Sequence, residues 1–196
     1  FIVVNILKIG IKLSEYLKFM NENFLYKKYF PYPEIREAQI KAIEFALDSF
    51  LNNKKRFVIL EAGTGVGKSA IGYTVARYIN ELKSQNDSKF NKGSYFLTTQ
   101  KILQEQYIKD YGRGPRKMCS IKSSTNYRCS YNKSNSCGEG QRLLKLSDKK
   151  SSFFKTCTFN CNYKKAKQEF IDAKEGVSNF SYFLAETYYS GKIEPR

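Results

Sequence analysis

Apolar side chains recur along the first half of this 196-residue chain at spacings typical of helices and strands. Over residues 33–53, Ile40, Ile43, Leu47 and Phe50 follow the three- and four-residue spacing of a helix with one buried face. The proline that opens this stretch suits the first turn of a helix, because its nitrogen has no hydrogen to leave unpaired there. We therefore expect an amphipathic helix over 33–53.

Two short apolar runs separated by a helical pattern predict two parallel strands joined by a helix. Residues 55–60, Lys-Arg-Phe-Val-Ile-Leu, are typical of a short buried strand, and residues 94–99 predict a second one. Apolar positions at helical spacing over 68–84 predict the connecting helix, and a further helical pattern follows over 101–111. This order of elements implies a parallel sheet with a right-handed crossover.

Residues 112–170 break these patterns and predict an insertion. They are rich in serine, asparagine, lysine and cysteine, and apolar residues are sparse. A helical pattern returns over 163–176, and residues 171–196 predict a return to the main core. Because the insertion can bury little apolar surface, it needs a stabilising device of its own.

The composition is that of a globular protein with a strongly basic balance. Lysine and arginine number 34 against 18 aspartate and glutamate, which gives a net charge of +16, while 41% of the residues are apolar. Such a charge favours a polyanionic partner, nucleic acid first, although a lysine- and asparagine-rich coding bias would also produce it. No apolar run is long enough to span a membrane, and residues 1–19 lack the cleavage pattern of a signal peptide. We therefore expect an intracellular protein that has no membrane partner.

The amino-terminal residues and the cysteines raise two further questions. Residues 1–19 precede the first methionine, Met20, and are expected to be a leader or upstream sequence. Five cysteines in a chain without a secretory signal favour metal binding or redox use over a disulfide scaffold. Four of them lie in polar segments of the insertion, where packing against apolar neighbours cannot explain them.

A glycine-rich loop stands between the first predicted strand and the helix that follows it. It matches a phosphate-binding loop through eight consecutive residues, Ala62, Gly63, Thr64, Gly65, Val66, Gly67, Lys68 and Ser69. Glycines let successive backbone N–H groups approach phosphate oxygens, and the positive end of the helix adds to the attraction. Lys68 can reach the β- and γ-phosphates, and the Ser69 hydroxyl can bind Mg²⁺. The loop predicts nucleoside triphosphate binding, although Ala62 replaces the glycine of the simplest pattern.

Hydrolysis requires an acidic motif as well, which normally follows a later strand and holds the Mg²⁺ ion. No apolar run of this chain ends in Asp-Glu, and Asp172, the nearest approach, falls in a helical, charged segment. For these 196 residues alone we therefore expect nucleotide binding with little or no turnover.

Six segments of the chain resemble the XPD/DinG-type helicases, an iron–sulfur-containing branch of helicase superfamily 2. They are YFPYPEIREAQ, EAGTGVGKS, FLTTQKILQEQ, KSSTNYRC, CTFNCNYKKAK and SNFSYFLAE, in this order, and they cover most of the chain but only the front part of such an enzyme. The resemblance implies an α/β fold with a P-loop NTPase (RecA-like) parallel sheet flanked by helices and an inserted cysteine-rich iron–sulfur domain. It places the first part of the ATP-binding domain at 20–111, the insertion at 112–170 and the incomplete return at 171–196, with SNFSYFLAE as the return strand.

The resemblance also implies roles for three residues outside the phosphate-binding loop. Gln39 stands at the family's adenine-recognising glutamine, and an amide can both donate to and accept from an adenine edge. Thr98 and Thr99 stand where the family's strand approaches nucleic acid, and their hydroxyls could donate to backbone phosphates. The alternatives are an ordinary exposed helix residue for Gln39 and β-branched packing for the two threonines.

For the cysteines the resemblance implies a [4Fe–4S] cluster. KSSTNYRC is similar to the family's entry into its iron–sulfur domain and CTFNCNYKKAK to the exit, so the expected ligands are Cys129, Cys137, Cys157 and Cys161. Cys119 precedes the entry motif and is expected to be a plain thiol. A cluster would replace the hydrophobic core that the insertion lacks. Four thiolates would also suit a structural zinc ion, and unliganded cysteines are the third alternative.

Basic and aromatic side chains interleave around these cysteines. Arg128 and Lys133, followed by Lys164 and Lys165, could line a basic path for a single strand whose bases stack on tyrosine rings. A solvated lysine-rich surface is the alternative for each of them.

The function expected for the parent protein is that of an ATP-dependent DNA helicase that moves 5′ to 3′ on single-stranded DNA. Its cofactors would be ATP, Mg²⁺ and the [4Fe–4S] cluster. Its partner would be single-stranded or forked DNA, and a monomer is the expected state. The alternative is a catalytically inactive module that binds nucleotide and nucleic acid and holds a structural zinc ion.

Overall fold

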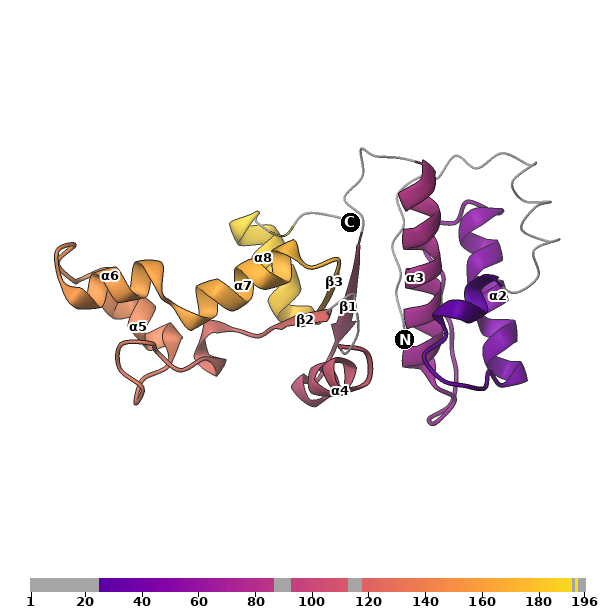
Figure 1. Ribbon diagram of the computed structural model, residues 1–196, viewed down its shortest axis with the longest axis horizontal. Helices are drawn as coiled ribbons and strands as arrows, with labels where there is room; N and C mark the ends of the chain where they lie inside the picture. The colour runs from indigo at the N-terminus through magenta and orange to yellow at the C-terminus, as the bar shows by residue number, and fades with distance from the viewer. Residues whose placement is uncertain (1–24, 87–92, 113–117, 192, 194–196) are drawn as a thin grey trace. The chain divides into compact units, whose positions relative to one another are not determined.

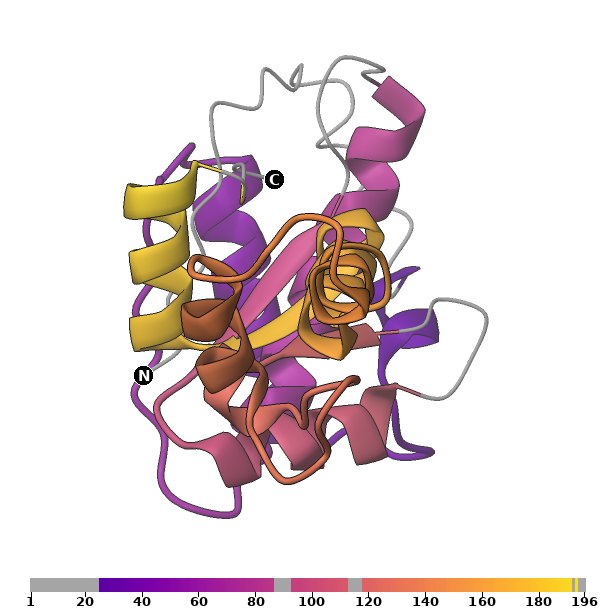
Figure 2. The same cartoon turned by 90° about the vertical axis from the view of Figure 1, so that its left-hand side faces the viewer.

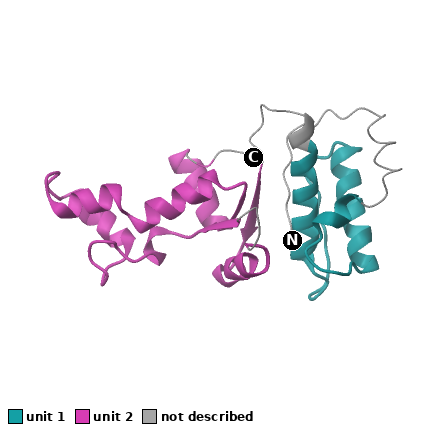
Figure 3. Cartoon of the chain, viewed as in Figure 1, with its two compact units in different colours: residues 1–90 teal, residues 91–196 magenta. Residues whose placement is uncertain are grey.

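A computed structural model describes residues 25–86, 93–112, 118–191 and 193, and the predicted leader over 1–19 lies outside these residues. The chain forms two compact units, residues 1–90 and residues 91–196 (Figure 3). The domain boundaries expected near residues 111 and 170 remain predictions.

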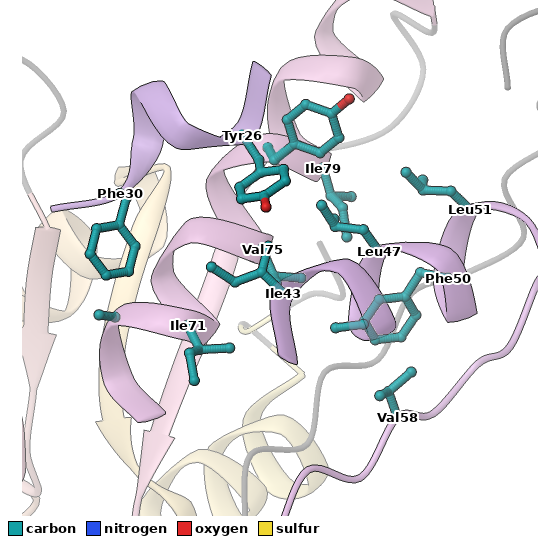
Figure 4. Packing of buried hydrophobic residues seen from close by; sticks show 13 residues of the cluster. Tyr26, Phe30, Ile43, Leu47, Phe50, Leu51, Val58, Ile71, Val75 and Ile79 are labelled. Atoms are coloured by element: carbon teal, nitrogen blue, oxygen red, sulfur yellow. The ribbon is translucent and has the colours of Figure 1, made fainter. Parts of the chain in front are cut away.

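The first unit is a small helical core. It contains the 3-10 helix η1 (Leu25–Tyr29) and the α-helices α2 (Glu37–Leu51) and α3 (Lys68–Asn86) (Figure 1). The apolar faces predicted for both helices are confirmed. Figure 4 shows them packing together, with the side chains Tyr26, Phe30, Ile43, Leu47, Phe50, Leu51, Val58, Ile71, Val75 and Ile79.

Helix α2 begins later than its apolar pattern predicts. It starts at Glu37 rather than in the turn opened by Pro33, because Arg36 is its N-cap. The backbone N–H of Arg36 donates to the side-chain oxygen of Gln39 at 3.0 Å, which pairs a group that the helix leaves unpaired at its end.

The strand predicted over 55–60 is wrong. Within the described residues this segment forms no strand, and only Ile59 makes a β-bridge. Phe57 and Ile59 are 57% and 67% exposed, whereas Val58 is buried against the helices of its unit. Apolar composition favoured a buried strand here, but a strand also needs a hydrogen-bonded neighbour.

The second unit is built on a three-stranded parallel sheet in the order β1-β3-β2. The strands are β1 (Ser94–Thr98), β2 (Met118–Ile121) and β3 (Glu175–Asn179), with Ser94 and Met118 both paired to Glu175. The predictions of strand β1 and of the helix after it, α4 (Lys101–Tyr111), are confirmed. Strand β2 was missed, because its four residues lie inside the polar stretch that predicted an insertion.

The described residues of the second unit contain further helices besides α4. Helices α5 (Cys137–Leu144), α6 (Ser152–Phe159) and α7 (Asn162–Asp172) lie between β2 and β3, and the 3-10 helix η2 (Ser124–Asn126) precedes them. Figure 1 shows α5 and α6 beyond the far end of α7 from the sheet, and Figure 2 views the unit with these helices in front. Helix α7 confirms the helix predicted over 163–176 as far as Asp172, whereas Glu175 and Gly176 lie in strand β3.

The expected return strand SNFSYFLAE is mostly a helix. Strand β3 ends at Asn179, and α8 (Phe180–Ser190) follows directly, because the Asn179 side chain caps α8 by accepting from the Ser181 N–H at 3.0 Å. Phe170 on α7 and Ile121 on β2 are fully buried in one cluster, which joins α7 to the sheet. The second unit is therefore an α/β structure with a small parallel sheet flanked by helices.

Candidate phosphate-binding loop and thiol cluster

The glycine-rich loop ends where α3 begins, at Lys68. Gly65 and Gly67 have φ angles of 79° and 86°, in the left-handed region that residues with a Cβ rarely adopt. The loop therefore needs glycine at these two positions to turn into the helix. The amino-terminal end of α3, with its positive dipole end, follows directly.

The Lys68 ammonium group lies against the backbone of its own loop. Its Nζ donates hydrogen bonds to the carbonyl oxygens of Ala62 at 2.9 Å and Gly63 at 2.7 Å. Ser69 is half-buried in the first turn of α3. The predicted nucleotide-binding residues 62–69 are thus gathered around the start of one helix.

Two side chains from the start of α2 hold the loop from outside. Gln39 Nε2 donates to the carbonyl of Val66 at 2.8 Å, and an Arg36 guanidinium nitrogen donates to the carbonyl of Gly65 at 3.2 Å. Gln39 is only 4% exposed. The expected adenine contact of Gln39 remains a prediction. Sequence reasoning missed Arg36, whose only signal was its place three residues before the glutamine.

The four expected ligand cysteines come together in the second unit. All are free thiols with exposed fractions of 3 to 7%, namely Cys129, Cys137, Cys157 and Cys161. A Cβ added to Gly140 in α5 would lie 3.2 Å from the Sγ of Cys129 and 3.8 Å from the Sγ of Cys157. The glycine therefore leaves the space that lets two of the sulfurs approach the helix.

Each thiol is placed by a different local structure. The N–H of Cys129 donates to the Asn135 carbonyl at 2.9 Å, which closes the turn between the first two cysteines. Cys137 begins α5, Cys157 lies in the last turn of α6, and Cys161 is the N-cap of α7. Three helices thus converge on one group of thiols. Cys119 lies apart from them in the sequence, in β2.

The thiols affect one another's ionisation. Burial, followed by the neighbouring thiol of Cys129, raises the pKa of Cys157 to about 11. Burial is also the largest cause that raises the pKa of Cys137, which lies next to Cys161. Across the described part of the chain, no three His, Cys, Asp or Glu side chains have the geometry of a single metal-ion site.

The donor chemistry fits a metal centre even so. Four buried thiols supply the number and kind of ligands that a [4Fe–4S] cluster or a structural zinc ion takes. The identity of the centre, and whether one is bound, remain predictions.

A partly buried polar network joins helix α7, whose N-cap is Cys161, to α8. The hydroxyls of Tyr163 and Tyr182 lie 2.7 Å apart, and Tyr163 donates to Glu186 at 3.1 Å. Glu186 also pairs with Lys167. Burial, reinforced by the Glu186 carboxylate, raises the pKa of Tyr163 to about 12. The network fixes the direction in which α7 leaves the thiols.

The two threonines expected near nucleic acid lie at the carboxyl end of β1. Thr98 is 7% exposed, and its hydroxyl donates to the Gln100 carbonyl at 3.0 Å, whereas Thr99 is exposed. Asn179, at the end of β3, donates from its side chain to the Thr99 carbonyl at 2.9 Å. Asn179 was missed, because no sequence signal connects the ends of two strands so far apart.

The basic residues Arg128 and Lys133 are exposed on the turn around Cys129. Nearby, a cavity of about 570 Å³ is bordered by Glu105, Ile108, Lys109, Gly112, Ser120, Lys122, Asn126 and Tyr127. Lys122 and Glu105 pair across it at 2.7 Å. Its second lysine, Lys109, keeps the lining slightly basic.

A glycine loop that turns into a helix at Lys-Ser defines the phosphate-binding loop of the nucleotide-binding α/β proteins. The chain belongs to the family described as "Type III restriction enzyme, res subunit", whose model matches residues 32–182. This family is an amino-terminal domain of superfamily 2 helicases.

A probable ATP-dependent helicase of Methanocaldococcus jannaschii is 29% identical over 174 residues. The match covers 80% of this chain but only 26% of that relative, so the chain spans about a quarter of its length. No solved structure gives a match. Among the helices of the described residues, none is both long and apolar enough to cross a bilayer.

Proposed function

We propose that this chain is the ATP-binding and DNA-binding part of an ATP-dependent DNA helicase. The observation that carries the proposal is the loop geometry: Gly65 and Gly67 in the left-handed region, with Lys68 opening α3. Membership of a helicase family and the distant ATP-dependent helicase support the same reading.

Triphosphate binding would use groups that the loop already presents. The Lys68 ammonium would exchange the carbonyls of Ala62 and Gly63 for oxygens of the β- and γ-phosphates. The Ser69 hydroxyl would hold Mg²⁺, which offsets phosphate charge. Backbone N–H groups of residues 63–67 and the positive end of α3 would supply the remaining donors.

We propose a [4Fe–4S] cluster for the four buried thiols. Thiolates of Cys129, Cys137, Cys157 and Cys161 would hold the cluster, which would cross-link the segments that carry them. The convergence of α5, α6 and α7 on these thiols supports the assignment, as does the resemblance to XPD/DinG-type helicases. Zinc is the competing centre, and it belongs to the alternative of a binding module without turnover.

The proposed nucleic-acid partner is single-stranded or forked DNA. The net charge of +16 favours a polyanion, and the exposed Thr99, Arg128 and Lys133 offer donors for backbone phosphates. The 5′-to-3′ direction follows only from the resemblance. It belongs to the parent enzyme, because translocation requires parts beyond this chain.

Nucleotide binding is tested first with Lys68→Ala in the 196-residue chain. Mg·ATP binding should weaken by at least roughly tenfold, since a charge-assisted contact is worth about 1.5–3 kcal/mol. The control is Lys41→Ala on α2, whose ammonium is exposed and paired with Glu37. Single-stranded DNA affinity should remain close to that of the parent chain in both variants. An unchanged ATP affinity in Lys68→Ala would remove the site assignment.

The metal centre is tested by iron, labile sulfide and zinc content after purification without oxygen. We expect about four iron and four sulfide per chain, with a broad absorption band at about 400 nm. Cys129→Ser should lose the iron, whereas Cys119→Ser should keep it. One zinc ion with no sulfide would favour the binding module.

A further inference from the structure

The cavity of the second unit lies between the carboxyl-terminal half of α4, strand β2 and the 3-10 helix η2. Its volume of about 570 Å³ falls within the range of about 300–1,000 Å³ that is typical of small-molecule sites. No residue of the phosphate-binding loop and no expected ligand cysteine is among the described residues that line it. The cavity is therefore a feature that neither of the two candidate sites explains.

The ring of Tyr127 forms a fixed part of the cavity wall. Its hydroxyl accepts from the backbone N–H of Lys122 at 3.3 Å, and its ring lies beside that of Tyr163, with the centroids 5.7 Å apart. Burial is the largest cause that raises the pKa of Tyr127, so the phenol stays neutral beside an anionic ligand. Together with Ile108, the ring offers apolar contact to a planar ligand.

Two lysines place positive charge beside these apolar side chains. Lys122 pairs with Glu105 at 2.7 Å, and Lys109 is exposed on α4. Two ammonium groups against one carboxylate leave the lining with a net positive charge. A ligand that carries phosphate is therefore attracted to this part of the surface.

Ser120, on β2, brings an unsatisfied polar group to the same wall. Its Oγ is buried, and within the described part of the chain it makes no hydrogen bond. Buried polar atoms are normally paired, and a serine hydroxyl can turn about its single bond either to donate or to accept. A ligand whose edge carries donors and acceptors would supply the missing partner.

The cavity is connected to the end of β1 at which Thr99 is proposed to meet nucleic acid. Lys101, two residues further along the chain, donates from its ammonium group to the side-chain oxygen of Asn126 at 2.9 Å. Asn126 itself lines the cavity. A nucleic-acid strand that passes Thr99 and Lys101 therefore reaches the rim of the cavity.

A planar body, a polar edge and flanking negative charge are the features of one nucleotide in such a strand. We propose that the cavity holds one unpaired base of the bound single strand, with Lys109 and Lys122 beside the neighbouring phosphates. The inference rests on the proposed DNA binding. It adds a place where the protein holds a base and not only the backbone.

The test compares a fluorescent oligothymidylate with an abasic oligomer that has the same number of phosphates, by anisotropy on the 196-residue chain. The parent chain should bind the oligothymidylate at least roughly tenfold more tightly, as expected for contact with one base. Ile108→Trp fills the cavity without changing its charge, so it should remove most of this preference and leave the Kd of the abasic oligomer unchanged. Gln106→Trp adds the same ring at an exposed position of α4 outside the lining, and it should keep the preference.

Two smaller changes separate the base from its phosphates. Ser120→Ala removes only the hydroxyl and should reduce the preference by about fivefold, the worth of one hydrogen bond. Lys109→Ala should weaken both oligomers alike and lower the slope of log Kd against log salt by about one. Lys41→Ala, whose ammonium is exposed and paired with Glu37 on α2, is the control and should change neither the preference nor the slope.

A folded Ile108→Trp chain that keeps the full base preference would overturn the inference. If that variant loses the helical circular dichroism of the parent chain, Ser120→Ala decides, and an unchanged preference there would overturn it. Equal affinities of the parent chain for the two oligomers would also overturn it, because DNA would then be held through its phosphates alone.

Two further results concern the ligand itself. Free thymidine monophosphate that binds the parent chain but not Ile108→Trp, with equal base preference in both, would assign the cavity to a free nucleotide instead. A folded parent chain that binds neither oligomer would overturn the proposed DNA binding as well.

Discussion

The side chain of Asn179 donates a hydrogen bond to the backbone carbonyl of Thr99 at 2.9 Å, across 80 positions of sequence. Asn179 is the last residue of β3 and is in register with Thr98, the last residue of β1, and Thr99 follows directly. The same side chain accepts from the Ser181 N–H and caps α8. One amide therefore fixes the end of the sheet at which we propose that Thr99 meets nucleic acid.

Asn179→Ala should lower the free energy of unfolding by about 2 kcal/mol, combining a lost helix cap and a lost interstrand hydrogen bond. Single-stranded DNA affinity should also fall, because the Thr99 segment loses its anchor. Asn160→Ala, at an exposed residue after α6, is the matched control and should leave both unchanged. Chemical denaturation and fluorescence anisotropy measure the two effects, and equal results for the two variants would contradict the role of Asn179.

Gly67→Ala should destabilise the first unit by about 1–3 kcal/mol, since its φ is strained for alanine. The new methyl group would also displace the amide of Gln39. Gly63→Ala is the matched change within the same loop, because a Cβ there meets nothing within 4 Å. Its unfolding free energy should stay within about 0.5 kcal/mol of the parent value. Urea titrations compare the two, and a Gly63→Ala chain that is as unstable as Gly67→Ala would refute the explanation.

Gly140→Ala should lower the iron bound per chain by at least half, because its methyl group would press on the sulfurs of Cys129 and Cys157. Gly138→Ala is the control from the same helix. Its methyl group would crowd Thr125 at 3.0 Å instead of the thiols. Iron and sulfide analysis after anaerobic purification separates them. Similar losses in both would show that α5 stability, and not space beside the sulfurs, limits binding.

Glu186→Gln should weaken the coupling between α7 and α8 in a way that depends on pH. Burial by itself raises the pKa of Glu186, but the hydrogen bond from Lys167 and further donors outweigh it and hold the pKa below its usual value. A carboxyl group with a lowered pKa stabilises the fold above its unfolded pKa of about 4.3, and that contribution is lost as pH falls through the folded value.

The free energy of unfolding of the parent chain should therefore be higher than that of Glu186→Gln by about 1 kcal/mol or less at neutral pH. The difference is small because the ion pair is only partly buried. This difference should shrink on acidification below about pH 4. Glu169→Gln, exposed on α7, provides the control and should show a much smaller difference. Thermal melts between neutral and acid pH test this, and a difference that grows on acidification would contradict the assignment.

Local patterns predicted those parts of the fold that local energetics control. The spacing of Ile43 and Leu47, and of Ile71 and Val75, is a property of single helices, and both buried faces are confirmed. The strands β1 and β3 show how far prediction from local patterns reaches. The first was recognised from its apolar run, whereas most of the expected return strand is α8, because the cap at Asn179 starts a helix there.

Elements that depend on distant partners could not be derived in this way. Strand β2, four residues in a polar stretch, exists because β3 pairs with it. Residues 55–60 have a strand-like composition but no ladder in the described structure. The competing influence in both cases is hydrogen bonding between segments, which propensity does not contain.

The sequence by itself determined the chemistry that this protein carries: a glycine loop ending in Lys68 and Ser69, four cysteines in polar segments, and an excess of basic residues. These follow from residue type and short-range spacing. Only the tertiary structure decided where that chemistry lies. It brought Cys129 and Cys137 to Cys157 and Cys161, and it turned the Gln39 amide onto Val66, because packing and hydrogen bonding act between residues that are remote in the chain.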